Sequence, residues 1–124
     1  MKPFSICFLT LIHFLCTARA EEKEYREIVI LGNDAMQFDL KSFEVSPEER
    51  VALTFKNAGS MPKVAMGHNL VVLKKNVDAL SFGQKVLASG GSASNPLPNS
   101  LLGDVLAHTK LLGPGESERI TFVS

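Results

Sequence analysis

The side chains best suited to metal or acid–base chemistry are His68 and His108. His68 stands between a loop and the apolar run that begins at Asn69, so it could be a metal ligand or a hydrogen-bonded structural residue. His108 lies in an alternating segment, which favours an ordinary surface or core histidine. No cysteine follows Cys16, and the sequence contains no G-x-S-x-G, H-E-x-x-H or phosphate-binding glycine motif. Nucleophilic catalysis is therefore a poor explanation of this chain, and we do not expect an enzyme.

The start of the chain has the features of a secretory signal peptide. Lys2 gives a short positive region, residues 4–16 are mostly apolar, and residues 18–20 form a small-x-small cleavage motif. The apolar stretch is too short for a membrane-spanning helix, which needs about 20 such residues. We therefore expect residues 1–20 to be a cleaved signal peptide, residues 21–124 to form one exported domain, and no membrane anchor.

Charge and cysteine content exclude nucleic acid as a partner and a disulfide in the mature domain. The sequence has 13 basic and 13 acidic side chains, and removal of Lys2 and Arg19 with the leader leaves a slight acidic excess. No basic stripe is present to neutralise phosphates, so we expect no nucleic-acid binding. Both cysteines, Cys7 and Cys16, also lie in the leader. The mature domain must then be stabilised by packing, without a disulfide.

The elements that would position His68 are mostly strands. Seven short apolar or alternating runs, separated by Gly, Asn, Asp and Pro, indicate strands, roughly six in all. These runs lie at residues 28–31, 36–38, 43–45, 51–55, 69–73, 105–112 and 119–123. The apolar residues of segment 77–88 are spaced as in a helix, and this is the only helix that we expect. Residues 90–100 are rich in Gly, Ser, Asn and Pro and predict an irregular loop. Pro62 predicts irregular structure up to Asn69. Because strands do not alternate with helices, we expect an all-β sandwich.

Three sequence blocks extend over almost the whole predicted domain. They are Gly32-Asn33-Asp34-x-Met36-Gln37-Phe38, Pro62-Lys63-x-x-Met66-Gly67-His68-Asn69, and Ala107-His108-Thr109-Lys110-Leu111-x-Gly113-x-Gly115-Glu116 with Thr121-Phe122. In order and spacing they resemble the azurins, blue-copper proteins of the cupredoxin family. The resemblance implies a cupredoxin-like Greek-key β-sandwich with one short inserted helix. It also implies copper as cofactor, single-electron transfer as function, a periplasmic location, and redox partners such as c-type cytochromes.

The resemblance also assigns roles to individual residues. Gly67, through its carbonyl, and His68, through its imidazole, match the first half of the copper site. Asn69 matches a residue that joins the two ligand loops by hydrogen bonds. His108 matches a histidine that is not a ligand.

Further matches concern the surface and one cross-link. Met36, Met61 and Met66 match an apolar patch where redox partners dock, although they could equally be ordinary core or rim residues. Azurins have a disulfide whose positions correspond here to Arg26 and Glu49, which could form an ion pair instead. An exposed pair contributes about 0 to 1 kcal/mol, against about 2 to 4 for a disulfide.

The second half of the copper site has no counterpart up to Ser124. The family's Cys, second His and Met ligands lie on a later loop, so we expect a sandwich without its last two strands that does not bind copper stably. One interpretation is an incomplete copy of an azurin-type electron carrier. The alternatives are a non-functional truncated product or a non-redox, cupredoxin-derived binding module whose open sheet accepts a strand from another chain. A metalloenzyme using His68 and His108 ranks last.

Overall fold

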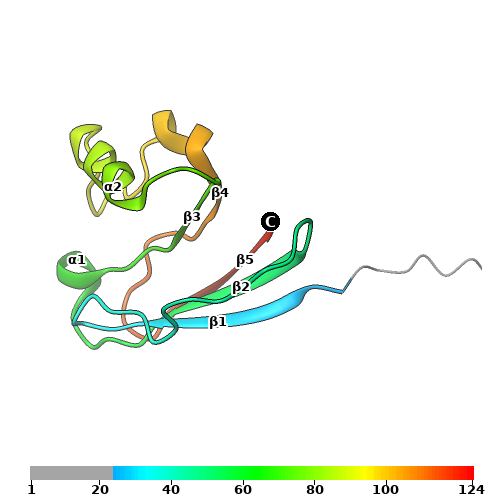
Figure 1. Ribbon diagram of the computed structural model, residues 1–124. Coiled ribbons are helices and arrows are strands. Elements are labelled where there is room, and N and C mark those ends of the chain that lie inside the picture. The colour runs from blue at the N-terminus through cyan, green and yellow to red at the C-terminus, as the bar shows by residue number, and fades with distance from the viewer. Residues whose placement is uncertain (1–23) are drawn as a thin grey trace, which may run out of the picture.

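The computed structural model describes residues 24–124 (Figure 1). The predicted signal peptide at residues 1–20 lies outside these residues. Within the described part, no helix combines the length and the apolar character needed to cross a membrane.

Strands make up most of the regular structure, as the sequence predicts. In chain order the elements are β1 (Arg26–Gly32), β2 (Arg50–Asn57), α1 (Lys63–Met66), β3 (Val71–Leu73), α2 (Ala79–Ala88), a 3₁₀ helix η1 (Asn99–Asp104), β4 (Val105–His108) and β5 (Ser117–Val123).

The strands form two sheets. One has the order β1-β2-β5, with β1 parallel to β2 and β2 antiparallel to β5; the other pairs β3 with β4 in antiparallel fashion. In Figure 1 the β3–β4 layer lies above the three-stranded sheet, and α2 and η1 lie beyond it on the far side. This two-layer arrangement of strands with few helices agrees with the predicted all-β cupredoxin-like sandwich.

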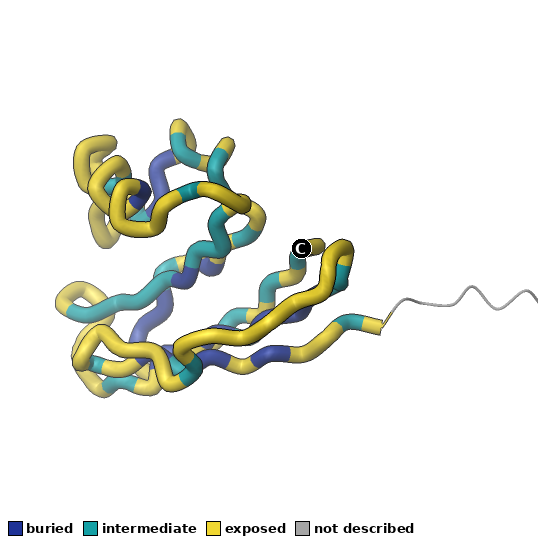
Figure 2. Tube along the Cα trace, viewed as in Figure 1, coloured by how far each residue is buried: buried dark blue, intermediate teal, exposed yellow. Residues whose placement is uncertain are grey.

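The core lies where the two layers face each other. Because successive strand residues point to opposite faces, the buried positions alternate along β1 and, apart from the additionally buried Ala52, along β2. Figure 2 shows these buried positions, and it shows α2 as mostly exposed. The fully or largely buried cluster consists of Ile28, Ile30, Val51, Leu53, Phe55, Leu70 and Leu112. Leu70 and Leu112 come from outside the three-stranded sheet, so the cluster joins the two layers.

The prediction of strands at residues 36–38 and 43–45 was wrong. The side chain of Asn33 accepts hydrogen bonds from the N–H groups of Ala35 (3.0 Å) and Gln37 (3.2 Å), and Met36 has a positive φ of 54°. This turn prevents a regular ladder, and only an isolated bridge between Gly32 and Phe38 remains. Because β1 and β2 are parallel, the segment between them must cross back over the sheet.

The prediction of a single helix was also incomplete. The helix at residues 77–88 is present as α2, with the carboxylate of Asp78 accepting from the N–H of Ser81 at 2.8 Å. However, α1 and η1 also form, and each directly follows a proline, Pro62 or Pro98. Proline therefore begins two short helices here instead of keeping the chain irregular. The strand expected at residues 105–112 is shorter and ends at His108.

Candidate metal centre

The segment that carries His68 leaves α1 through Gly67. The N–H of Gly67 donates to the carbonyl of Lys63 at 2.9 Å, and the chain then becomes extended, with φ −66° and ψ 142°. A Cβ at this position would lie 2.7 Å from the Lys63 carbonyl oxygen and 2.9 Å from Cγ of Leu111. Close packing alone therefore requires glycine before His68, whether or not a metal is bound.

The backbone of His68 is fixed by a two-way bridge to Leu112. The N–H of His68 donates to the Leu112 carbonyl at 3.0 Å, and the N–H of Leu112 donates to the His68 carbonyl at 2.7 Å. The side chain of Leu112 is fully buried in the core. The side-chain amide of Asn57, at the end of β2, donates to the same Leu112 carbonyl at 3.0 Å. The candidate ligand is thus tied through Leu112 to the centre of the sandwich.

The imidazole of His68 has an unsatisfied nitrogen. Its Nε2 is buried and has no hydrogen-bond partner among the described residues. A buried polar atom without a partner costs about 1 to 3 kcal/mol, so such an atom usually indicates a ligand, an ion or water. The ring lies at a pocket of about 130 Å³ lined by Gly32, Asn33, Met36, Gln37, Phe38, His68 and Asn69.

The turn before α1 is held by Asp34. Its carboxylate accepts from the N–H of Ser60 at 2.7 Å, the hydroxyl of Ser60 at 3.0 Å and the N–H of Met61 at 3.4 Å. The Ser60 N–H, followed by the other two donors, lowers the pKa of Asp34 below its ordinary value, and the nearby charge of His68 adds to this effect. A Cβ on Gly59 would lie 2.0 Å from Oδ1 of Asp34, so glycine is required beside this carboxylate.

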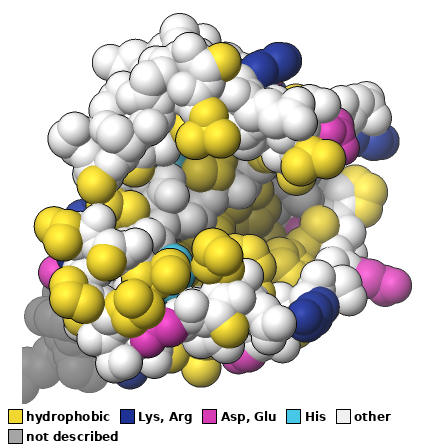
Figure 3. Space-filling view, turned by 90° about the vertical axis from the view of Figure 1, so that its left-hand side faces the viewer, with side chains coloured by type: hydrophobic (Ala, Val, Ile, Leu, Met, Phe, Trp, Pro, Cys, Tyr) yellow, Lys and Arg dark blue, Asp and Glu magenta, His cyan; other side chains and the backbone are white. Residues whose placement is uncertain are grey.

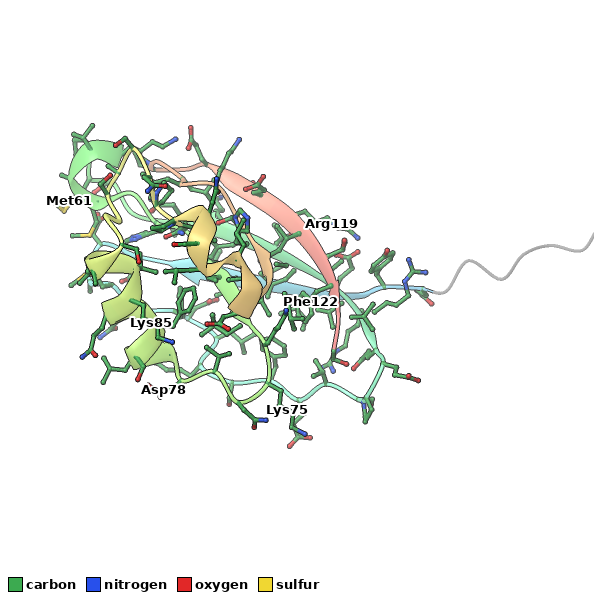
Figure 4. The ribbon with its side chains drawn as sticks, turned by 90° about the horizontal axis from the view of Figure 1, so that it is seen from above. Met61, Lys75, Asp78, Lys85, Arg119 and Phe122 are labelled. Carbon is green, nitrogen blue, oxygen red and sulfur yellow. The ribbon has the colours of Figure 1, made fainter. Side chains whose placement is uncertain are left out.

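The three methionines lie at one end of the molecule but differ in exposure. Met36 is 79 % exposed and lines the pocket at His68, and Met61 is 40 % exposed. Met66, the last residue of α1, is half-buried. Figure 4 places Met61 at the α1 end, far from Phe122 on β5. Figure 3 views this end and shows hydrophobic side chains around a central hollow.

The other residues singled out from the sequence lie as follows. Asn69 lines the pocket beside His68 and also an apolar cavity between the layers. His108 ends β4, and its Nδ1 lies 3.2 Å from the carbonyl oxygen of Thr109. Arg26 and Glu49 form the expected ion pair, with Nη1 and Oε2 3.5 Å apart.

The described residues fit only part of a blue-copper centre. Such a centre needs two imidazoles and a thiolate around the metal. Gly67 can offer a carbonyl and His68 an imidazole, but both cysteines of the chain lie before residue 24. Residues 24–124 contain no group of three or more His, Cys, Asp or Glu side chains that could hold a metal ion.

Comparison with known proteins identifies the family. Residues 27–124 match the family described as copper binding proteins, plastocyanin/azurin family. The chain belongs to this family of copper-binding cupredoxins.

Individual relatives agree with this assignment. The chain is 43 % identical over 98 residues to azurin of Bordetella pertussis, covering 75 % of this chain and 61 % of that protein. It is 38 % identical over 101 residues to azurin of Alcaligenes faecalis, covering 77 % and 73 %. The crystal structure of dithionite-reduced auracyanin from Roseiflexus castenholzii matches with a TM-score of 0.63 and 30 % identity, covering 79 % of this chain and 74 % of that one. The chain thus spans less than two thirds of the Bordetella relative.

Sequence reasoning overlooked Asn57 and Asp34. A signal for Asn57 was present, because the buried positions Val51, Leu53 and Phe55 predict by alternation that residue 57 is also buried. A polar side chain at such a position needs internal hydrogen bonds. The contact of Asp34 with Ser60 depends on how two loops meet in space, and no spacing in the sequence indicates it.

Proposed function

We propose that the protein is an exported electron carrier of the azurin type and that Gly67 and His68 are the share of its copper centre contributed by residues 24–124. The observation that carries the proposal is the buried, unpartnered ring nitrogen of His68 beside a pocket. Copper held by imidazole and thiolate alternates between Cu(I) and Cu(II) with little rearrangement, which suits single-electron transfer. The thiolate cannot come from residues 24–124, which contain no cysteine, and in this proposal the second imidazole and the axial ligand also come from outside them.

The surroundings of His68 support two further parts of the proposal. Asn69 follows His68 directly and lines the same pocket, and in this proposal it orients the ligand by hydrogen bonds to a second ligand loop. Met36 and Met61 expose soft apolar surface near the site, and together with Met66 they form the patch at which a redox partner such as a c-type cytochrome docks.

The location in the cell forms the last part of the proposal. Residues 1–20 serve as a cleaved signal peptide, and residues 21–124 belong to the exported domain in the periplasm. N-terminal sequencing of the secreted protein tests this part, with a mature start at Glu21 as the expected result.

The test of the copper site compares two histidine variants with the wild type, each produced as the full-length product of its gene. Copper(II) is added to the wild type, His68→Ala and His108→Ala, and binding is followed by electron paramagnetic resonance and visible absorption. We expect His68→Ala to lose the copper signal and His108→Ala to keep it. An intense blue colour supports a complete thiolate centre, and colourless binding that depends on His68 supports the half-site. Copper binding that is equal in all three proteins would refute the assignment of His68.

A second candidate function, a non-redox module that accepts a strand, is favoured by the open edge of β3. The N–H of Thr109 donates to the carbonyl of Leu70 at 2.9 Å, and the N–H of Lys74 donates to the carbonyl of Asp104 at 2.9 Å. By the alternation of antiparallel pairing, Val71 and Leu73 then direct their backbone groups away from β4. Within residues 24–124 no other strand pairs with this edge.

An apolar cavity lies beside the same edge. It has a volume of about 270 Å³ and is lined by Ile30, Phe38, Phe43, Leu53, Asn69, Leu70, Val71 and Val72. Phe38 and Phe43 remain partly exposed there. An extended segment with apolar residues at alternate positions would satisfy both the backbone groups and the cavity.

Val71→Pro tests this alternative, because proline removes the outward N–H of Val71 without touching the bonds to β4. Sedimentation of the wild type and the variant over a range of concentrations measures association. A monomeric wild type at all concentrations, or equal association of the two proteins, would count against strand acceptance by this edge.

A further inference from the structure

Asn57 is the most completely buried polar side chain near the candidate ligand. It lies at the end of β2 with no exposed surface. Its Nδ2 donates to the Leu112 carbonyl at 3.0 Å, and its Oδ1 accepts from the N–H of Gly59 at 2.8 Å. Its backbone N–H donates to the Glu116 carbonyl at 3.0 Å, and its backbone carbonyl accepts from the N–H of Gly115 at 2.8 Å. Asn57 therefore joins the end of β2 to the turn at Gly59 and to the loop of residues 112–116.

One of these segments leads directly to His68. The carbonyl of Leu112 accepts two hydrogen bonds, one from Asn57 Nδ2 and one from the His68 N–H, both at 3.0 Å. The side-chain amide of Asn57 thus fixes the orientation of the Leu112 carbonyl, to which the backbone of His68 is hydrogen-bonded. Among the described residues, Nε2 of the imidazole has no hydrogen-bond partner. The orientation of the ring consequently depends on its backbone anchor.

We propose that Asn57 is a positioning residue for His68, acting through the shared carbonyl of Leu112. This inference rests on the proposed function for the claim that His68 binds copper, but the anchoring itself does not involve the metal.

The two hydrogen-bond partners of the Asn57 side chain, the Leu112 carbonyl and the Gly59 N–H, require an amide at position 57. An aspartate at position 57 has nearly the same shape but no N–H, and it would place a carboxylate oxygen against the Leu112 carbonyl oxygen inside the core. An aliphatic side chain would leave the N–H of Gly59 without its partner as well. Only a side chain that donates at one atom and accepts at the other satisfies both neighbours.

The test uses the full chain, labelled with ¹⁵N, as wild type, Asn57→Asp and Val51→Ala. Val51 is buried at the opposite end of β2 and pairs with Phe122 of β5, so its variant lowers global stability without removing a hydrogen bond of Leu112. Amide hydrogen exchange is measured for His68 and Leu112 relative to the slowest amides of β1 and β2, and the ring resonances of His68 are recorded.

We expect exchange at His68 and Leu112 to become at least about tenfold faster relative to these amides in Asn57→Asp, because a buried hydrogen bond is lost. The ring resonances of His68 should shift as well. In Val51→Ala the relative exchange rates and the ring resonances should stay as in the wild type. Equal acceleration of all amides in Asn57→Asp, with unchanged ring resonances, would show a general structural role and overturn the proposal.

A measurement on the wild type covers the case in which Asn57→Asp does not fold. The side-chain amide protons of Asn57 should exchange much more slowly than those of the exposed Asn76, and fast exchange at Asn57 would overturn the proposal. Copper takes no part in these measurements. Failure of His68 to bind copper would therefore not affect the conclusion on anchoring. Failure of Asn57 to anchor His68 would likewise not affect the conclusion on copper binding.

Discussion

Gly32 of β1 should be a position at which one added methyl group strongly destabilises the domain. A Cβ there would lie 2.9 Å from Cζ and 3.1 Å from Cε2 of Phe55, both closer than carbon atoms normally approach. Phe55 is fully buried, and its ring packs edge-to-face on Phe38, with centroids 5.9 Å apart at 85°. The Phe55 ring therefore has little room to withdraw. Backbone strain is not involved, because Gly32 does not have a positive φ.

The expected cost of Gly32→Ala is that of overpacking a well-filled core, about 1 to 3 kcal/mol. For a domain of this size, each kcal/mol lowers the melting temperature by about 4 to 8 °C. Phe55→Leu removes the two ring atoms that an alanine would meet. The double variant should therefore be more stable than the sum of the single effects predicts, by about 0.5 to 3 kcal/mol.

Urea unfolding of the wild type, both single variants and the double variant gives the coupling free energy directly. Additivity within about 0.5 kcal/mol would refute the claim that the two residues are in contact. A stable Gly32→Ala protein would show that the Phe55 ring can move aside, and that the core around Gly32 is looser than the distances to Phe55 indicate.

Three other changes probe single features. Gly83→Ala should stabilise the domain by about 0.5 to 1 kcal/mol in thermal unfolding, because Gly83 lies within α2 and a Cβ there meets open space; a loss of stability would contradict this. The hydrogen bond from Arg119 lowers the pKa of Glu27 below 4.5. The ion pair therefore stabilises the fold above the pKa that Glu27 has in the unfolded chain, and this effect is lost as the pH falls through its lower pKa in the folded protein. Arg119→Gln should flatten the acid side of the curve of stability against pH, and an unchanged slope would argue against the pair. Arg26→Met should cost no more than about 1 kcal/mol, with the difference from wild type shrinking in high salt, because the partner Glu49 is only partly buried.

The paired strands could be predicted because their alternation reflects burial of one face. In β2, Val51, Leu53 and Phe55 point into the core, and the period of two is visible in the sequence. The same period at Met36 and Phe38 has another origin, since the side chain of Asn33 closes a turn there. Periodicity indicates which residues are apolar, but it does not show whether a neighbouring strand is present to pair with.

The candidate site was predictable only in part. Gly67 and His68 followed from the resemblance of a short block, and the structure adds a packing reason for the glycine. The roles of Asn57 and Leu112 depend on contacts between residues far apart in the chain. Neither the order nor the spacing of the residues contains that information, because it arises when the two layers of the sandwich close on each other.

The order of strands in the larger sheet has a consequence for folding during synthesis. The middle strand β2 has β1 on one side and β5 on the other, and β5 is made much later, since Arg50 pairs with Val123. While the ribosome makes the intervening segment, one edge of β2, which has more buried positions than any other strand within residues 24–124, stays unpaired. Such long-range pairing slows folding and leaves apolar surface and an unpaired strand edge exposed to other chains. We therefore expect the nascent chain to depend on chaperones, and its yield to fall sharply when synthesis outpaces them.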